Sequence, residues 1–173
     1  MAEKRSSSPK KSSSKARANL VKEENAPYQS TRRTLHYLGG KASVLAGTLV
    51  REEEDFIQLI KKGIPRKSLD HLMSITGLTA AEMAALMHTS DRTLRRYKPS
   101  TLLNSVQSER VIEIARLYSR GEEVFGNSDD FKIWMNTKLA SLGNRIPKEF
   151  LDTSMGIEIL LDTLGRIEQG VFA

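Results

Sequence analysis

The sequence predicts an all-α protein in which a helix-turn-helix unit is followed by a smaller helical domain and preceded by a disordered basic tail. Two observations support this fold class. From about residue 31 onward, apolar residues recur at the i, i+3, i+4 and i+7 spacing of amphipathic helices, and no segment shows a convincing strand-like alternation. Serine, threonine and glycine also stand where helices would begin and end.

The first 30 residues have the composition of a disordered segment. They open with "MAEKRSSSPKKSSSKARANLVK", which is rich in serine and lysine and poor in apolar residues, so it has too little surface to bury on folding. The tail is either a solvating extension or an electrostatic arm that strengthens nonspecific DNA binding.

Helix signals begin after a less regular stretch. In residues 31–60, "HYLGGKASVLAGTLV" could hold a short strand or a loop. "EEEDFIQLIKKG" then places acids in a first turn, lysines in a last turn and Gly63 at the C-cap. "SLDHLMSITG" predicts a helix with Ser68 as N-cap, with Gly77 after its last turn and with one apolar face formed by Leu69, Leu72 and Met73.

Three further helices are predicted in the second half. "VIEIARLYSRG" carries Val111, Ile114, Ala115 and Tyr118 on one face and should end at Gly121. "SDDFKIWMNTKLASLG" offers Ser128 as N-cap and places Trp134 on a face more typical of a core than of an interface. The last helix lies in "SMGIEILLDTLGRIEQG", with an apolar face of Ile157, Leu160, Leu161 and Leu164.

Residues 79–98 have the pattern of a helix-turn-helix within a domain spanning 31–120. Thr79 and Glu82 form a T-x-x-E capping box. Apolar residues four apart and then three apart would close a shared core, with a small residue where the helices cross; these are Met83 and Met87, Leu94 and Tyr97, and Ala84. The turn falls at His88, a residue type that tolerates positive φ better than most, and Ser90 can cap the second helix.

The outward positions of the second helix are basic, which favours DNA as the ligand. Arg92 and Thr93 occupy the first exposed positions, where side chains reach base edges in the major groove. Residues further along would pair with phosphates, and Pro99 stops the helix. The predicted DNA-binding residues are Ser90, Arg92, Thr93, Arg95, Arg96 and Lys98. The alternative is a basic helix pair that is merely solvated.

Charge is divided unevenly along the chain. Residues 61–120 carry 11 Lys and Arg against 5 Asp and Glu, a net charge of +6, whereas residues 121–173 carry 5 against 9, a net charge of −4. A basic middle favours a polyanion and an acidic end favours a protein, so we expect two partners.

Composition and motifs argue against an enzyme. The chain has no cysteine and three scattered histidines, and it lacks a P-loop, an H-E-x-x-H motif and a Ser-His-Asp set. We therefore predict no catalytic activity, no cofactor and no metal. No apolar run is long enough to span a bilayer, and no signal peptide is recognisable, so we expect a cytoplasmic protein.

Residues 63–173 resemble the Xre/MbcA/ParS antitoxins. The matching segments are "GIPRKSLDHL", "LTAAEMAALMHTSDRTLRRY", "QSERVIEIARLYSRGEEVFG" and "WMNTKLASLGNRIPKEFLDTSMGIEILLDTLGRIEQGVFA". The resemblance implies an Xre-like helix-turn-helix followed by a toxin-binding domain at 121–173. It also implies a type II antitoxin that blocks the active site of a RES-type, NAD-consuming toxin by direct contact and represses its own operon. The chain would bind the toxin, not NAD.

The end of the last helix is the predicted toxin contact. Gly165 interrupts a good helix, where glycine costs about 1 kcal/mol relative to alanine, so either close helix packing or close approach of a partner should explain it. Arg166 is the strongest single candidate for reaching into the toxin. The predicted toxin-binding residues are Gly165, Arg166, Glu168, Gln169, Gly170, Val171 and Phe172.

Two other functions fit the same sequence. One is a free-standing Xre-like transcriptional regulator with a C-terminal sensing or dimerisation domain, and the other is a nucleoid-associated structural protein that uses the basic tail. Helix-turn-helix proteins usually read two-fold sites as dimers. We therefore expect a homodimer, with "FIQLI" in residues 31–60 as one candidate interface, and a hetero-oligomer with the toxin.

Overall fold

The computed structural model describes residues 29–41 and 44–171, and over these ranges the protein is largely helical. The predicted all-α class is confirmed. A helical segment at 29–37 precedes a small hairpin and the remaining helices. The elements are, in order, β1 (Val44–Leu45), β2 (Thr48–Leu49), α2 (Asp55–Lys62), α3 (Arg66–Thr76), α4 (Ala80–Leu86), α5 (Asp91–Arg96), α6 (Ser105–Phe125), α7 (Ser128–Met135), the 3₁₀ turns η1 (Ala140–Leu142) and η2 (Pro147–Phe150), and α8 (Ser154–Glu168).

The segment that the sequence left open contains the hairpin. β1 and β2 are antiparallel, with Val44 opposite Leu49 and Leu45 opposite Thr48. Ala46 and Gly47 form the turn with φ of 53° and 73°, as a two-residue type I′ hairpin loop requires. The predicted basic tail, except for residues 29 and 30, lies outside the described residues.

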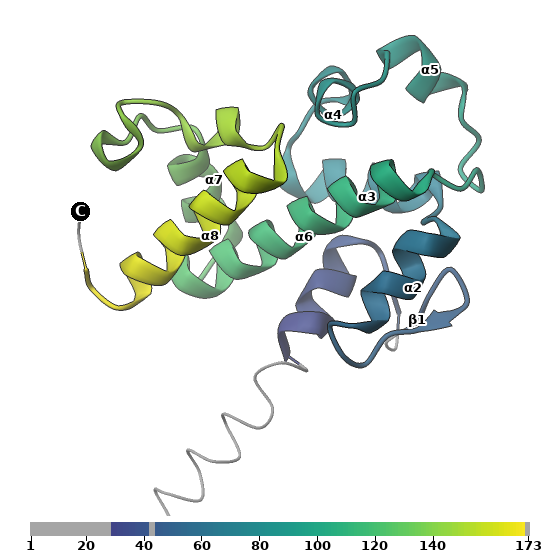
Figure 1. Ribbon diagram of the computed structural model, residues 1–173, viewed down its shortest axis with the longest axis horizontal. Helices are drawn as coiled ribbons and strands as arrows, with labels where there is room; N and C mark the ends of the chain where they lie inside the picture. The colour runs from purple at the N-terminus through teal and green to yellow at the C-terminus, as the bar shows by residue number, and fades with distance from the viewer. Residues whose placement is uncertain (1–28, 42–43, 172–173) are drawn as a thin grey trace, which may run out of the picture.

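Helix α6 organises the molecule. It contains 21 residues and therefore extends over roughly 30 Å. Figure 1 shows α6 crossing the middle of the fold, with α7 and α8 packed toward its C-terminal end and α2 and α3 toward its N-terminal end. Helices from both halves of the chain therefore pack on one continuous helix.

The predicted end of α6 at Gly121 is wrong, because the helix continues to Phe125 and ends at Gly126 in the left-handed conformation. Gly121 is instead buried under a ring of α7: a Cβ added there would lie 2.3 Å from carbon atoms of Phe131. The glycine signals close packing between two helices rather than a helix end.

Two predicted N-caps are also wrong. Ser68 is buried inside α3, whose N-cap residue is Pro65. This helix starts earlier because the preceding backbone is held by a neighbouring segment, with Leu103 N–H donating to Ile64 O over 2.8 Å. Ser128 is the first residue of α7, and Asn127 caps it by accepting a hydrogen bond from Asp130 N–H at 2.8 Å.

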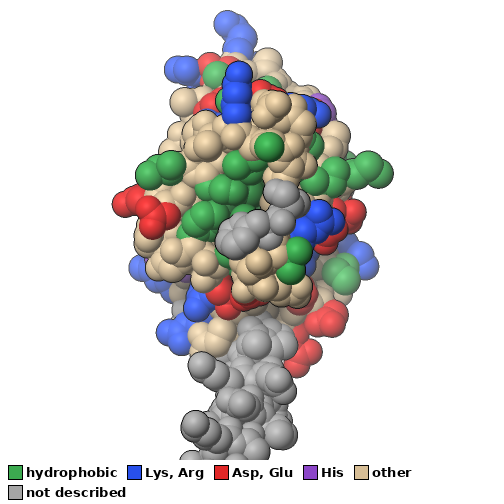
Figure 2. Space-filling model, turned by 90° about the vertical axis from the view of Figure 1, so that its left-hand side faces the viewer, with side chains coloured by type: hydrophobic (Ala, Val, Ile, Leu, Met, Phe, Trp, Pro, Cys, Tyr) green, Lys and Arg blue, Asp and Glu red, His purple; other side chains and the backbone are tan. Residues whose placement is uncertain are grey.

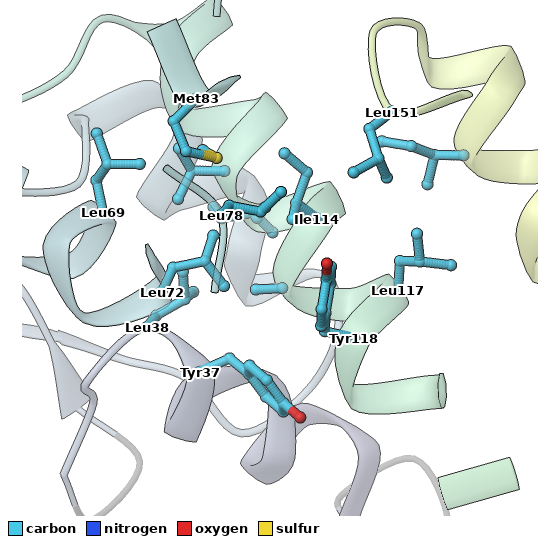
Figure 3. Packing of buried hydrophobic residues seen from close by; sticks show 14 of the residues in the cluster. Tyr37, Leu38, Leu69, Leu72, Leu78, Met83, Ile114, Leu117, Tyr118 and Leu151 are labelled. Atoms are coloured by element: carbon cyan, nitrogen blue, oxygen red, sulfur yellow. The ribbon is translucent and has the colours of Figure 1, made fainter. Parts of the chain in front are cut away.

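One hydrophobic core serves the described residues on both sides of α6. Figure 3 shows Leu69 and Leu72 of α3 on one side of α6 and Leu151 on the other, with Ile114 and Leu117 between them. All five side chains are buried. The two halves of the chain therefore share one hydrophobic core and are not independent domains joined by a linker.

The apolar face of "FIQLI" is mostly used within this core. Phe56 and Leu59 are buried and Ile60 packs against the core, so Ile57 is the apolar residue of α2 that remains exposed. Within the described ranges, no helix is long and apolar enough to cross a membrane.

Candidate functional site

The first helix of the predicted helix-turn-helix is α4, and its start is fixed by the predicted capping box. Glu82 N–H donates to Thr79 Oγ1 at 3.2 Å, and Thr79 N–H donates to Glu82 Oε2 at 2.7 Å. The box satisfies two backbone donors that would otherwise be free at the helix N-terminus. This prediction is confirmed.

The turn between α4 and α5 has the predicted geometry. His88 adopts φ of 50°, and Thr89 N–H closes the turn by donating to Ala84 O at 2.9 Å. Ser90 then caps α5 by accepting from Thr93 N–H at 3.1 Å. The chain reverses within a few residues, and this places α5 against α4.

A small shared core holds the two helices together. Met83, Met87 and Leu94 are buried, Ala84 is buried at the crossing, and Tyr97 is partly buried against the same cluster. The inward positions are those that the sequence predicted. Residues between them along α5 must therefore face outward.

The predicted DNA-binding residues lie on or beside α5, but they are not equivalent. Arg92, Arg96 and Lys98 are exposed and form no ion pair with the rest of the described chain. Arg95 is exposed but bonded to Asp91 at 2.8 Å. Thr93 is partly buried, and its hydroxyl is bonded to Ser90 Oγ at 2.8 Å. The main role of Ser90 and Thr93 is therefore to stabilise the N-terminus of α5.

Residues of α3 fix the far end of α5. The Arg66 guanidinium donates to Leu94 O and pairs with Asp70 at 2.6 Å. Lys67 N–H donates to Pro99 O at 3.0 Å, which places the exposed Lys67 beside the end of α5. Sequence reasoning missed Lys67 because a contact between distant segments leaves no local spacing signal.

The second candidate site is an apolar groove in the C-terminal half, here called the α7–α8 groove. Its volume is about 410 Å³. Figure 2 shows hydrophobic side chains gathered on the face of the molecule that carries this end of the fold. The lining residues are Phe125, Trp134, Leu139, Ser141, Leu142, Ile159, Asp162, Thr163, Arg166, Ile167 and Val171.

Aromatic packing forms the inner wall of the groove. Phe131 is buried and stacks on Trp134, with the ring centroids 5.5 Å apart, and Phe125 lies 5.8 Å from Trp134. Trp134 is 9% exposed, so the prediction of a mainly core role is confirmed, although its edge reaches the groove. Aromatic side chains in this position offer a large rigid contact surface.

Two of the predicted toxin-binding residues line this groove. Arg166 is exposed and Val171 is 55% exposed, and both line it. Glu168 is tied to Arg120 of α6, while Gln169 and Gly170 are exposed just beyond α8. Phe172 lies outside the described residues.

Gly165 does not owe its presence to packing against the described part of the chain. A Cβ added there would meet none of the described atoms within 4 Å. The helix-packing explanation is therefore removed for these ranges, and close approach of a partner remains a prediction.

Two family models match consecutive parts of the chain. Residues 55–116 match the antitoxin Xre-like helix-turn-helix domain, and residues 120–170 match the antitoxin Xre/MbcA/ParS C-terminal toxin-binding domain. The chain therefore carries both an antitoxin Xre-like helix-turn-helix domain and an Xre/MbcA/ParS toxin-binding domain. α4 and α5 lie in the first matched domain, and α7, α8 and nearly all of the groove lie in the second.

Two curated relatives align with about two thirds of the chain. An Antitoxin Xre of Yersinia enterocolitica serotype O:8 / biotype 1B is 29% identical over 119 residues, covering 68% of this chain and 80% of the relative. An Antitoxin Xre of Photorhabdus laumondii subsp. laumondii is 23% identical over 115 residues, covering 65% of this chain and 78% of the relative. Both relatives are Xre antitoxins, and each aligns over about four fifths of its own length.

Nothing in the described part of the chain resembles a metal centre. No group of three or more His, Asp or Glu residues lies close enough there to hold an ion. The two candidate surfaces of the described residues are the basic helix α5 and the apolar α7–α8 groove, and both are suited to binding.

Proposed function

We propose that this chain neutralises a RES-type, NAD-consuming toxin by binding the toxin and blocking its active site. The observation that carries the proposal is the α7–α8 groove, which lies within the matched toxin-binding domain and has Arg166 at its rim. The RES chemistry itself rests on the family resemblance.

The groove and the end of α8 would act together in this interface. Trp134, Ile159 and Ile167 supply the apolar surface that anchors a partner, and burial of such a surface contributes most of the affinity of protein interfaces. Arg166 supplies a charge that can enter a polar site on the toxin. Beside it, Gly165 and Gly170 add little bulk, so a partner backbone can approach closely, and Gln169 adds a polar group.

The test uses the product of the gene next to this one as the candidate toxin. The purified product is incubated with NAD, alone and with increasing amounts of the full chain, and the remaining NAD is measured. Loss of NAD that stops at a fixed ratio of the two proteins supports the proposal. A product that binds the chain but consumes no NAD overturns the RES assignment alone. A product that neither binds nor responds favours a free-standing regulator.

We also propose that the helix-turn-helix reads an operator in front of this antitoxin's own gene. The exposed Arg92 can bond bidentately to guanine in the major groove, and Arg95, Arg96, Lys98 and Lys67 are placed to meet phosphates. Binding to the native promoter duplex is compared with binding to a scrambled duplex from about 50 to 200 mM salt. Equal affinity for both duplexes would contradict sequence reading and favour an architectural role.

The complex is proposed to contain a homodimer of this chain. Two helix-turn-helix units related by a two-fold axis match the two half-sites of an operator. Because Phe56 and Leu59 are buried within the chain, Ile57 is what "FIQLI" can still offer to a second copy. Analytical ultracentrifugation of the wild type and of Ile57→Arg measures whether α2 takes part.

A further inference from the structure

A single carboxylate joins the helix-turn-helix to the toxin-binding half. Glu82 Oε2 accepts hydrogen bonds from Thr79 N–H at 2.7 Å and from Thr79 Oγ1 at 2.8 Å, and so completes the cap of α4. The second oxygen, Oε1, is 2.6 Å from Lys148 Nζ. The two oxygens therefore serve different parts of the molecule.

Lys148 belongs to the toxin-binding half. It lies in η2, which packs on both α7 and α8, the helices that line the groove. Its side chain is 26% exposed and that of Glu82 is 39% exposed, so the pair is partly shielded from water. A carboxylate that already caps a helix has lost rotamer freedom, so the ion pair costs little further ordering.

The ion pair between Lys148 and Glu82 lies beside a hollow in the surface. A hollow of about 380 Å³ lies between the two halves beside the ion pair, lined on one side by Leu78, Ala85 and Leu86 and on the other by Asn136 and Ile146. Close packing does not therefore fix α4 against η2 at this place. The Lys148–Glu82 pair is the polar tie that spans the hollow.

We propose that Lys148, although it lies in the toxin-binding half, is a positioning residue for operator binding. It holds the N-terminal turn of α4, while Arg66 holds the C-terminal end of α5 through Leu94 O. Because α4 and α5 share Met83, Met87 and Leu94 as one core, tilting α4 would tilt α5 as well. The inference rests on the operator binding proposed above.

The test is a double-mutant cycle on operator affinity. Lys148→Met removes the charge and keeps most of the side-chain length. Glu82→Gln also breaks the ion pair, yet it preserves the capping box, which accepts glutamine as well as glutamate. We expect each variant to bind its own promoter duplex about two- to fivefold more weakly, and the double variant to be no weaker than either single one.

Three controls separate positioning from general stability. Lys138→Met removes an exposed lysine of the same half that forms no ion pair with the described residues, and its operator affinity should equal that of the wild type. Lys148→Arg keeps the positive charge, so its operator affinity should be close to that of the wild type. All measurements are made well below the melting temperature of each variant, where a purely stabilising pair would leave operator affinity unchanged.

The outcomes distinguish the two proposals. If the wild type shows no preference for its promoter, operator reading fails and the role of Lys148 fails with it. If the wild type binds specifically but Lys148→Met and Glu82→Gln bind equally well, operator reading stands and the positioning role is overturned. Additive losses in the double variant would also overturn it, because the two residues would then act independently.

Discussion

In the helix-turn-helix, the apolar residues Met83, Met87 and Leu94 are closed off from solvent and the surface of α5 is left to charged side chains. In the C-terminal half, Phe125, Trp134 and Ile159 continue the core outward into an open groove. A charged surface can bind the phosphates of DNA, and the affinity of such binding falls as the salt concentration rises. An apolar groove favours a protein partner whose affinity comes from buried apolar surface. That affinity depends only weakly on salt concentration.

The largest expected effect is on operator binding. Replacing both Arg92 and Arg96 with alanine should weaken binding by about 100-fold or more, since a bidentate base contact is worth ~1–3 kcal/mol and a phosphate contact adds to it. Fluorescence anisotropy with the native promoter duplex measures the change, and the slope of log affinity against log salt should fall by about one for the lost phosphate contact.

Arg95→Ala is the matched control on the same helix. Its guanidinium is already bonded to Asp91, so its loss should weaken binding less than the loss of Arg96. A double variant that binds its promoter as tightly as the wild type would end the assignment of α5 as the reading helix.

The groove should show the next largest effect. Ile159→Arg places a charge among the apolar side chains of the α7–α8 groove and should weaken binding to the toxin tenfold or more, a loss above ~1.4 kcal/mol. Operator affinity should not change. Isothermal titration of the toxin into each variant makes the comparison.

Ile133→Arg tests whether position matters rather than charge. Ile133 is 66% exposed on α7 and does not line the groove, so this variant should bind the toxin as the wild type does. Equal losses from both substitutions would show that the groove is not the site of contact.

Two glycines of this half give opposite predictions for stability. Gly121→Ala forces a methyl group against Phe131, and such overpacking costs about 1–3 kcal/mol, more than the ~1 kcal/mol gained in helix propensity. Gly165→Ala meets no described atom and should gain up to ~1 kcal/mol of stability. Urea unfolding followed by circular dichroism measures both.

The second glycine also bears on function. If a partner backbone approaches α8 at Gly165, the alanine variant should bind the toxin more weakly even though it is more stable. A variant that gains stability and keeps full toxin affinity would leave Gly165 with no role in the interface.

The helix-turn-helix could be predicted almost residue by residue, and the groove could not. The capping box at Thr79 and Glu82, the turn at His88 and the cap at Ser90 all act within a few residues of chain, so their spacing carries the information. The groove is formed by α6, α7, η1 and α8, and no local pattern records how far apart their side chains lie. Gly121 shows the same limit, since a glycine under a ring and a glycine at a helix end look alike in sequence.

The smallest expected effect concerns the tie between the two regions. Burial alone would raise the pKa of Glu82, but the hydrogen bonds from Lys148 and Thr79 outweigh it and hold the pKa at about 2, below the ordinary value of 4.5. The charged form is therefore favoured in the folded state. The stability it contributes is fully present above about pH 4.5 and is lost as the pH falls toward 2.

In Lys148→Met, the loss of stability on acidification should begin at a higher pH than in the wild type. Without the ammonium group, the pKa of Glu82 should rise, and the stability difference between variant and wild type should be largest above pH 5 and should be much smaller at pH 2. Because both side chains are partly exposed, the difference should not exceed about 1 kcal/mol. Urea midpoints from pH 2 to 7 measure it, and a difference that persists unchanged at pH 2 would show that Lys148 stabilises the fold by packing rather than by its charge. In that case the contact between α4 and η2 would be apolar in nature, and raising the salt concentration would leave it intact.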